Sequence, residues 1–211
     1  MDIAWTPEGA LRALTVVVDA GQMDRRSFLA LFGASITSPA HEWLIAHPIT
    51  RLASTAGTTV PADVVDRLDD MTASLRRMDD KVGGGQLLHL VREHLRYVTT
   101  LLRTGRYNDS VGRRLHATAA ELLRLAGFVS FDSGHHGLAQ RYWGAGLRTA
   151  HAAGDRALGA NIVGFMSCQA KDLDGGPQGR RTGWHRPPGL PRSQRQGHCH
   201  PCAPCRRSPR Q

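Results

Sequence analysis

Apolar residues recur along most of the chain at the three- and four-residue spacing of an amphipathic helix. The clearest run follows Pro61, which suits the first turn of a helix because its missing N–H costs little there. Its apolar positions are 4, 3, 4, 3 and 4 residues apart: Val64, Leu68, Met71, Leu75, Met78 and Val82. Charged residues occupy the other positions, and Gly83 to Gly85 end the run. This pattern predicts a long helix with one buried face.

The same spacing predicts further helices towards the C-terminus. One covers residues 86–104 and stops at Gly105; its apolar stripe is Leu87, Leu88, Val91, Leu95, Val98, Leu101 and Leu102. The next is capped by Asn108 or Asp109 and ends at Gly127, and a short helix follows over residues 128–133. The last two cover residues 137–152, closed by Gly154, and residues 156–173.

The first 60 residues are less regular. Residues 7–20 predict a short helix with Leu11, Leu14, Val17 and Val18 facing inward, and short helices are expected over 25–33 and 40–46. Ser35–Pro39 and Ser54–Thr59 have the composition of loops. No stretch alternates apolar and polar residues for long, so the sequence predicts an all-α fold of antiparallel helical hairpins.

Composition changes abruptly at residue 174. Residues 174–211 hold eight Arg, seven Pro, six Gly and three of the four Cys, against one acid and one Leu. Such a segment has too little apolar surface to offset its ordering entropy, so we expect a disordered basic tail. This mixture is also typical of a GC-rich gene read out of frame, and we interpret the tail as a frameshift product. The expected organisation is an irregular helical linker region over 1–60, a helical domain over 61–173 and the tail over 174–211.

The formal net charge of +9 belongs mostly to this tail, because residues 1–173 retain only +2 of it. A nearly neutral body offers no stripe of one sign to a phosphate backbone, so we expect no specific DNA binding by this chain alone. Nucleic-acid binding through the tail is an alternative function, whose affinity would fall steeply with salt. No apolar run approaches the ~20 residues that a membrane-spanning helix needs.

A repeat of about 34 residues accounts for several of the small residues. Gly127, Gly134, Ala139, Trp143 and Gly146 have the spacing of the tetratricopeptide motif, which they resemble. In that motif, small residues let two antiparallel helices approach and an aromatic side chain plugs between them. Gly146 stands where the motif prefers Ala, and the early aromatic is missing. An ordinary helical bundle with glycine turns is the alternative.

A longer resemblance rests on packing and turn residues spread over roughly residues 5–173. The matching runs are Asp24–Leu31, Pro39–Leu44, Gly83–Gly85, Thr104–Tyr107, Phe131–Gly134, Gly137–Tyr142 and His151–Gly159. They resemble the linker and the C-terminal tetratricopeptide-like region of actinobacterial transcriptional regulators of the Xre type, which carry a lambda-repressor-like helix-turn-helix. In those regulators the DNA-binding domain comes first, and we expect this chain to begin after it.

The resemblance implies the sensor or protein-interaction region of a transcriptional regulator, non-enzymatic and cytoplasmic, without a DNA-binding domain of its own. Its partner would be a protein or peptide or a small-molecule effector, and a homo-oligomer is also possible on this basis. Candidate residues for lining a groove are His135, Arg141, Tyr142 and Arg148. The sequence contains no catalytic motif or cofactor fingerprint, so we expect neither an enzyme nor a cofactor.

Two local motifs point elsewhere. Arg25, Arg26, Phe28 and Leu29 match the core of a twin-arginine export signal, which makes an exported helical protein an alternative. The apolar run that follows is short, however, and acidic residues precede it. His198, Cys199, His200, Cys202 and Cys205 have the spacing of some iron–sulfur and zinc sites. They are weak metal candidates, because no apolar shell flanks them to orient the ligands.

Overall fold

The computed structural model describes residues 3–19, 34–78 and 84–174 of the chain. Within these ranges it has seven helices and one pair of very short strands. The helices are α1 (Pro7–Asp19), α3 (Ala34–Ile45), α4 (Ala62–Met78), α5 (Gly84–Thr104), α6 (Asp109–Asp132), α7 (His136–Ala153) and α8 (Arg156–Asp174). The prediction of an all-α fold is confirmed.

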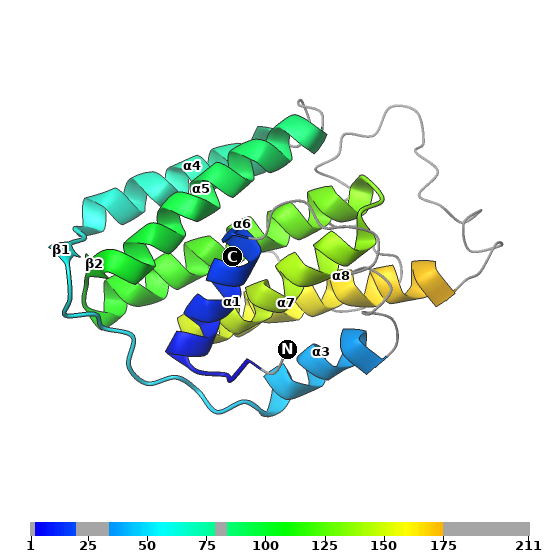
Figure 1. Cartoon of the computed structure of the whole chain (residues 1–211), viewed down its shortest axis with the longest axis horizontal. Helices are drawn as coiled ribbons and strands as arrows, with labels where there is room; N and C mark the ends of the chain where they lie inside the picture. Colours follow the sequence, from blue (N-terminus) through cyan, green and yellow to red (C-terminus); the bar gives the residue numbers. More distant parts are fainter. Residues whose placement is uncertain (1–2, 20–33, 79–83, 175–211) are drawn as a thin grey trace, which may run out of the picture.

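Helix α6 lies at the centre of the fold and contacts α4, α5, α7 and α8 (Figure 1). Helix α1 packs across α5 and α7, while α3 packs against α7 and α8. The main apolar core joins Leu14 of α1 to Leu95 of α5 and Leu122 of α6, all of them buried. The N-terminal helix therefore shares one core with the helices that follow it.

The two strands tie the start of α4 to the end of α5. Strand β1 (Thr58–Thr59) pairs in parallel with β2 (Gly105–Arg106), and Ser54 forms an antiparallel bridge with Tyr107. The segment that the sequence predicts as a loop, Ser54–Thr59, thus contains paired backbone. Its partner residues lie beyond α4 and α5 in the sequence, so local composition gives no sign of them.

Two helix boundaries follow the predicted capping residues. Asn108 caps α6, and its side-chain oxygen accepts a hydrogen bond from the Val111 N–H at 3.0 Å. Helix α7 ends at Gly154, whose φ of 76° lies in the left-handed region that glycine adopts without strain.

The predicted helix end at Gly127 is wrong, because α6 continues through this residue to Asp132 and includes the predicted short helix. Gly127 faces α7, and a Cβ at this position would lie only 2.2 Å from Nε1 of Trp143. The Trp143 ring is fully buried, and its Nε1 donates to the Arg124 carbonyl at 3.3 Å. This glycine lets two helices approach closely instead of ending one of them.

Two further predictions differ from the structure. Ser35–Pro39 is helical, with Pro39 inside α3, rather than a loop. In α4, Met71 is exposed, and Val65 and Thr72 turn inward together with Leu68 and Leu75. Leu68 and Leu75 belong both to the predicted apolar stripe with Met71 and to the observed one with Val65 and Thr72. Their spacing therefore does not distinguish the two stripes. The short helix expected over 25–33 lies outside the described residues.

A polar and aromatic cluster anchors the N-terminal segments on α7. Trp5 Nε1 donates to Oε2 of Glu42 at 3.1 Å, and Arg148 lies 3.6 Å from the same carboxylate. The Arg148 guanidinium also stacks 4.8 Å from the centre of the Trp5 ring. A hydrogen bond from Ser38 lowers the pKa of Glu42, and Trp5 and Arg148 act in the same direction.

The contact between Gly127 and Trp143 can be tested with a single methyl group. The change Gly127→Ala should lower the free energy of unfolding by about 1–3 kcal/mol, because the methyl group would overlap the buried indole ring. Gly144→Ala on α7 is the matched control, since no described atom lies within 4 Å of where its Cβ would be. This control should be neutral or stabilise by up to about 1 kcal/mol, as Ala favours a helix. Urea unfolding followed by circular dichroism measures both; equal midpoints for the two variants would refute the contact.

Candidate functional site

The structure does not bring the four candidate groove residues together. Tyr142 is 1% exposed and belongs to the main core, where burial raises the pKa of its hydroxyl. His135 is exposed in the turn before α7, and Arg141 is half-buried on α7. Arg148 is held at the N-terminal anchor, where its Nε donates to the Ile3 carbonyl at 3.2 Å. A groove cannot be lined by a side chain that the core encloses, so another site has to be considered.

The tetratricopeptide-like positions all lie on α6, on α7 or in the turn between them; Gly134 serves the turn and the others serve packing. Ala139 is buried on α7, and Gly134 has a φ of 79° in the turn. A Cβ at Gly146 would lie 3.1 Å from Ile162 Cδ1 of α8 and 3.3 Å from Leu123 Cβ of α6. These positions bring α6, α7 and α8 close together, which is how they position the surface described next.

An open pocket of about 200 Å³ lies where α4, α6 and the start of α8 meet. From α4 it is lined by Asp69, Thr72, Ala73 and Arg76. Helix α6 contributes Ala117, Thr118 and Glu121, and the far end is closed by Asp155 and Leu158. The pocket therefore combines small and apolar side chains with three carboxylates and one guanidinium.

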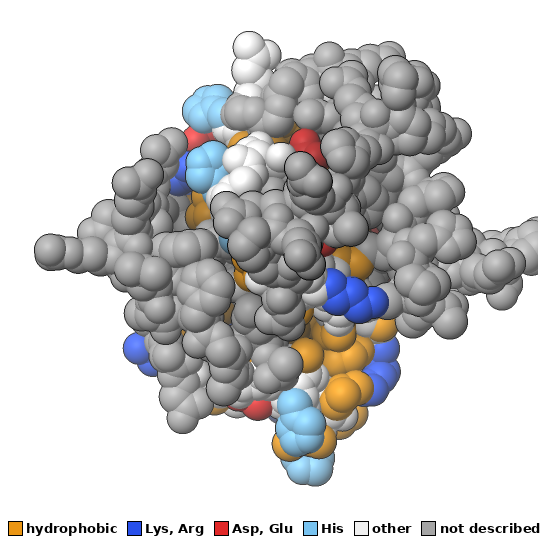
Figure 2. Space-filling model, turned by 90° about the vertical axis from the view of Figure 1, so that its right-hand side faces the viewer, with side chains coloured by type: hydrophobic (Ala, Val, Ile, Leu, Met, Phe, Trp, Pro, Cys, Tyr) orange, Lys and Arg blue, Asp and Glu red, His pale blue; other side chains and the backbone are white. Residues whose placement is uncertain are grey.

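Negative charge is concentrated along α4. Its first half carries Asp63, Asp66, Asp69 and Asp70. Figure 2 shows another face of the molecule, where hydrophobic side chains lie beside basic and histidine side chains at the lower right of the view. The pocket thus opens beside a locally acidic helix.

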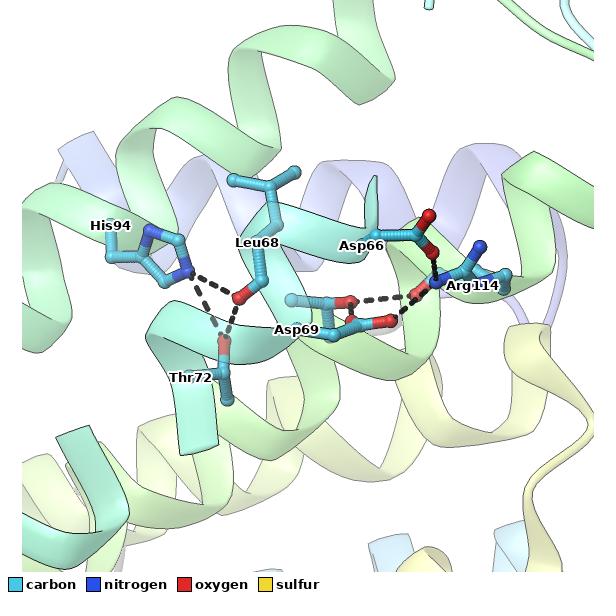
Figure 3. Close-up of polar contacts among 7 residues, drawn as sticks. Asp66, Leu68, Asp69, Thr72, His94 and Arg114 are labelled. Atoms are coloured by element: carbon cyan, nitrogen blue, oxygen red, sulfur yellow. Dashed lines mark hydrogen bonds and ion pairs between the residues drawn. The ribbon is translucent and has the colours of Figure 1, made fainter. Parts of the chain in front are cut away.

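Arg114 of α6 fixes this acidic face to the central helix (Figure 3). One of its terminal nitrogens donates to Asp66 at 2.7 Å and to Asp69 at 2.8 Å. The Thr118 hydroxyl donates to the other oxygen of Asp69 at 2.5 Å. Both carboxylates raise the pKa of Arg114, which keeps it charged. The Asp69 side chain is therefore held in one orientation at the edge of the pocket.

A second link, also drawn in Figure 3, joins the pocket wall to α5. The Thr72 hydroxyl donates to the Leu68 carbonyl at 2.8 Å, and Nε2 of His94 lies 3.1 Å from this hydroxyl and 3.2 Å from the same carbonyl. Since a carbonyl oxygen only accepts, a proton on Nε2 satisfies both contacts of the ring. Burial lowers the pKa of His94. The neutral ring thus fastens α5 to α4 behind the pocket.

The Thr72–His94 pair does not have the arrangement of a nucleophile with its base. In such a pair the imidazole nitrogen must accept the hydroxyl proton. Here the Thr72 hydroxyl lies 2.8 Å from the Leu68 carbonyl, and the 3.2 Å contact of His94 Nε2 with the same carbonyl favours the tautomer with a proton on Nε2, which cannot accept the hydroxyl proton. Thr72 is also 95% buried, so the contact stabilises the helix pair rather than presenting a reactive hydroxyl.

The opposite edge of the pocket holds Glu121 between two arginines. Arg124 Nε donates to Oε2 of Glu121 at 2.8 Å, and the Arg124 side chain is only 8% exposed. Arg76 reaches the other oxygen across the pocket at 3.5 Å with a side chain 44% exposed. The first pair is a fixed part of the structure, and the second is long and solvent-exposed.

Sequence reasoning missed this pocket. Charged residues outside the apolar stripe, here Asp69, Asp70, Arg67, Arg76 and Arg77, are also typical of an ordinary solvated helix face. The spacing of Asp69, Thr72, Ala73 and Arg76 places them on one side of α4, which was the only available signal. Nothing in the sequence indicates that α6 and the start of α8 would complete the lining.

The residues of the two local motifs lie outside the described part of the chain. This applies to Arg25, Arg26, Phe28 and Leu29 of the export motif and to His198, Cys199, His200, Cys202 and Cys205 of the tail. Among the residues that the structure does describe, no group of three or more His, Cys, Asp or Glu side chains could hold a metal ion. No helix in those ranges is long and apolar enough to cross a membrane.

The buried histidines make stability depend on pH. Burial lowers the pKa of His94, His116, His136 and His151 below the ordinary value of 6.5. As the pH falls below 6.5, these histidines therefore bind protons in the unfolded chain before they do so in the folded chain. The free energy of unfolding consequently decreases. Glu42, whose pKa lies below 4.5, loses its contribution only in more acidic solution.

We expect the urea midpoint to fall between about pH 7.5 and about pH 5.5. His94→Gln should reduce the size of this fall, because it removes one of the contributing groups. The control His89→Gln changes an exposed histidine on the same helix and should leave the fall intact. A midpoint that stays constant or rises on acidification would contradict the buried, neutral state of these rings.

Comparison with known proteins finds no match of this chain to a family model, to a curated protein or to a solved structure. The resemblance to Xre-type regulators therefore remains a prediction from the sequence. What the chain binds has to be inferred from the geometry of its own surface.

Proposed function

We propose that this chain is a non-enzymatic helical-repeat interaction region, the sensor or protein-binding part of a transcriptional regulator. From α4 to α8, each helix packs against the next one in the chain, and α6 also contacts both α4 and α8. Stacked hairpins of this kind expose elongated surfaces that suit protein segments. The sequence resemblance supplies the regulatory context and a cytoplasmic location.

One observation supports the pocket between α4, α6 and α8 as the proposed binding surface. Helices α5 and α7 are covered by α1, whereas α4, α6 and the start of α8 line a pocket open to solvent. Two charged side chains at the edge of this pocket are held by ion pairs with arginines of α6: Asp69 by Arg114 and Glu121 by Arg124. Pre-oriented polar groups around a small apolar floor favour binding, because little side-chain order has to be created when a ligand arrives.

A non-enzymatic role is supported by the contacts of the polar groups near the pocket. Thr72 donates to a carbonyl, Asp66 and Asp69 share the single charge of Arg114, and Glu121 pairs with Arg124. Groups satisfied in this way are suited to recognition rather than proton transfer. The partner in this proposal is a protein or peptide, and a small effector or a second copy of the chain are its other candidates.

Selection from a random peptide library displayed on phage tests the proposal. Peptides that bind the full chain should lose at least about tenfold in affinity for Ala117→Leu, which fills part of the pocket. Ala160→Leu on the exposed side of α8 is the matched control and should retain binding. Circular dichroism confirms that each variant is folded. The proposal fails if no peptide is enriched, or if every enriched peptide binds the Ala117→Leu variant as well as the native chain.

A further inference from the structure

The pocket has the dimensions and the lining of a site for one long side chain. Its volume of about 200 Å³ is comparable to one large residue, and its floor includes Ala73 of α4, Ala117 of α6 and Leu158 of α8. Leu158 is only 6% exposed, so this part of the floor is firmly packed. An aliphatic stem lying on these groups would bury apolar surface.

Carboxylates stand around this floor at three places. Asp69 projects from α4, Glu121 from α6, and Asp155 from the turn before α8. One oxygen of Asp155 accepts a hydrogen bond from the Leu158 N–H at 2.9 Å. Among the described residues, no Lys, Arg or His side chain forms an ion pair with Asp155. An apolar floor with acidic groups at its edge matches a side chain that is apolar along its length and cationic at its end.

The molecule already holds one cation in this way. The guanidinium of Arg114 is bound between Asp66 and Asp69 of α4 at 2.7 and 2.8 Å. For both carboxylates to contact the Arg114 guanidinium at these distances, their side chains must point from α4 towards α6. The acidic face of α4 is therefore oriented towards α6, and Asp69 belongs both to this face and to the lining of the pocket.

Arg76 is the internal competitor for the pocket. It spans the opening to reach Glu121 at 3.5 Å, and its side chain remains 44% exposed. Exposed pairs of this length contribute little, about 0–1 kcal/mol. Displacing Arg76 into solvent would leave Glu121 in place, because Arg124 holds it at 2.8 Å from a buried position.

From this arrangement we infer that the pocket recognises a lysine or arginine side chain of a peptide segment. The inference rests on the function proposed above and names the chemistry of the partner. The stem of the basic residue lies on Ala73, Ala117 and Leu158, and its cationic end takes the place of Arg76 beside Glu121, in a pocket that Asp69 and Asp155 also line. Neutral, acidic and aromatic anchors lack this charge complementarity.

Positional peptide libraries provide a direct test with the full chain. The probes are fluorescent peptides randomised at the flanking positions, with Lys, Arg, Glu or Leu fixed at the centre. Libraries centred on Lys or Arg should bind at least about tenfold more tightly than those centred on Glu or Leu, as measured by fluorescence anisotropy. Higher salt should weaken the preferred binding, because the recognised charges are partly exposed.

Three variants separate recognition from a structural effect. Asp155→Ser keeps a helix-capping oxygen but removes the charge, and it should weaken binding of the basic libraries about three- to tenfold. Arg76→Gln removes the competing cation and should tighten their binding about two- to fivefold. Asp70→Ser is the control, because this exposed carboxylate on α4 does not line the pocket. A structural role for Arg76 would instead weaken binding when the residue is replaced.

The possible failures are distinct. Pocket-dependent binding led by Glu- or Leu-centred libraries would overturn this inference while supporting the proposed function. The inference would also be overturned if the basic libraries bind more tightly than the others but Arg76→Gln does not strengthen their binding. The same holds if Asp155→Ser does not weaken it. If no library binds the native chain, both the inference and the proposed function are wrong.

Discussion

Almost every side of α6 is enclosed by another helix, and this burial is the constraint on which the rest of the fold depends. The helix can be surrounded only because small residues face its neighbours at the closest contacts. At Gly127 the indole of Trp143 occupies the space where a side chain would otherwise begin. Leu115 and Leu122 fill the opposite side of the helix and are completely buried. Larger residues at the glycine would separate α6 from α7 and open the core to water.

The same helix also fixes the chain that leads into α4. Asp109 accepts hydrogen bonds from the Leu52 and Ala53 N–H groups at 2.6 and 2.8 Å, and the first of these bonds lowers the pKa of its carboxyl most. Arg113 donates to the Ile49 and Thr50 carbonyls, each at 3.2 Å. The connection from α3 to α4 is therefore fastened to the first turns of α6. These contacts position the start of α4, one wall of the pocket, since α4 begins where the fastened segment ends.

Sequence spacing predicted most helices because their apolar stripes correspond to a single core face. Helices α5 and α7 are examples: Leu87, Val91 and Leu95 are buried as their spacing predicts, and Gly154 ends α7. Spacing failed at Gly127, because a glycine can end a helix or permit close packing, and only the position of Trp143 distinguishes the two.

The pocket could not have been predicted in the same way. Thr72 turns inward because the Leu68 carbonyl and His94 satisfy its hydroxyl, a condition that depends on α5. The carboxylates at the edge come from three parts of the chain, and their meeting depends on how α4, α6 and α8 are stacked. The prediction that Tyr142 lines a groove is wrong for the same reason. Helical periodicity defines the face of α7 on which Tyr142 lies, but it does not reveal which helices cover that face.

Hydrogen exchange over the full chain, with and without a peptide selected for binding, tests most directly whether the pocket between α4, α6 and α8 is the binding site. The account predicts slower exchange in the peptide-bound chain for residues 69–76 of α4, residues 117–121 of α6 and the first turn of α8, which together line the pocket. Exchange in α1 should not change, because α1 covers the other helices, α5 and α7. Protection confined to α5 and α7, with faster exchange in α1, would show instead that a ligand displaces α1, and it would contradict the assignment of the binding surface.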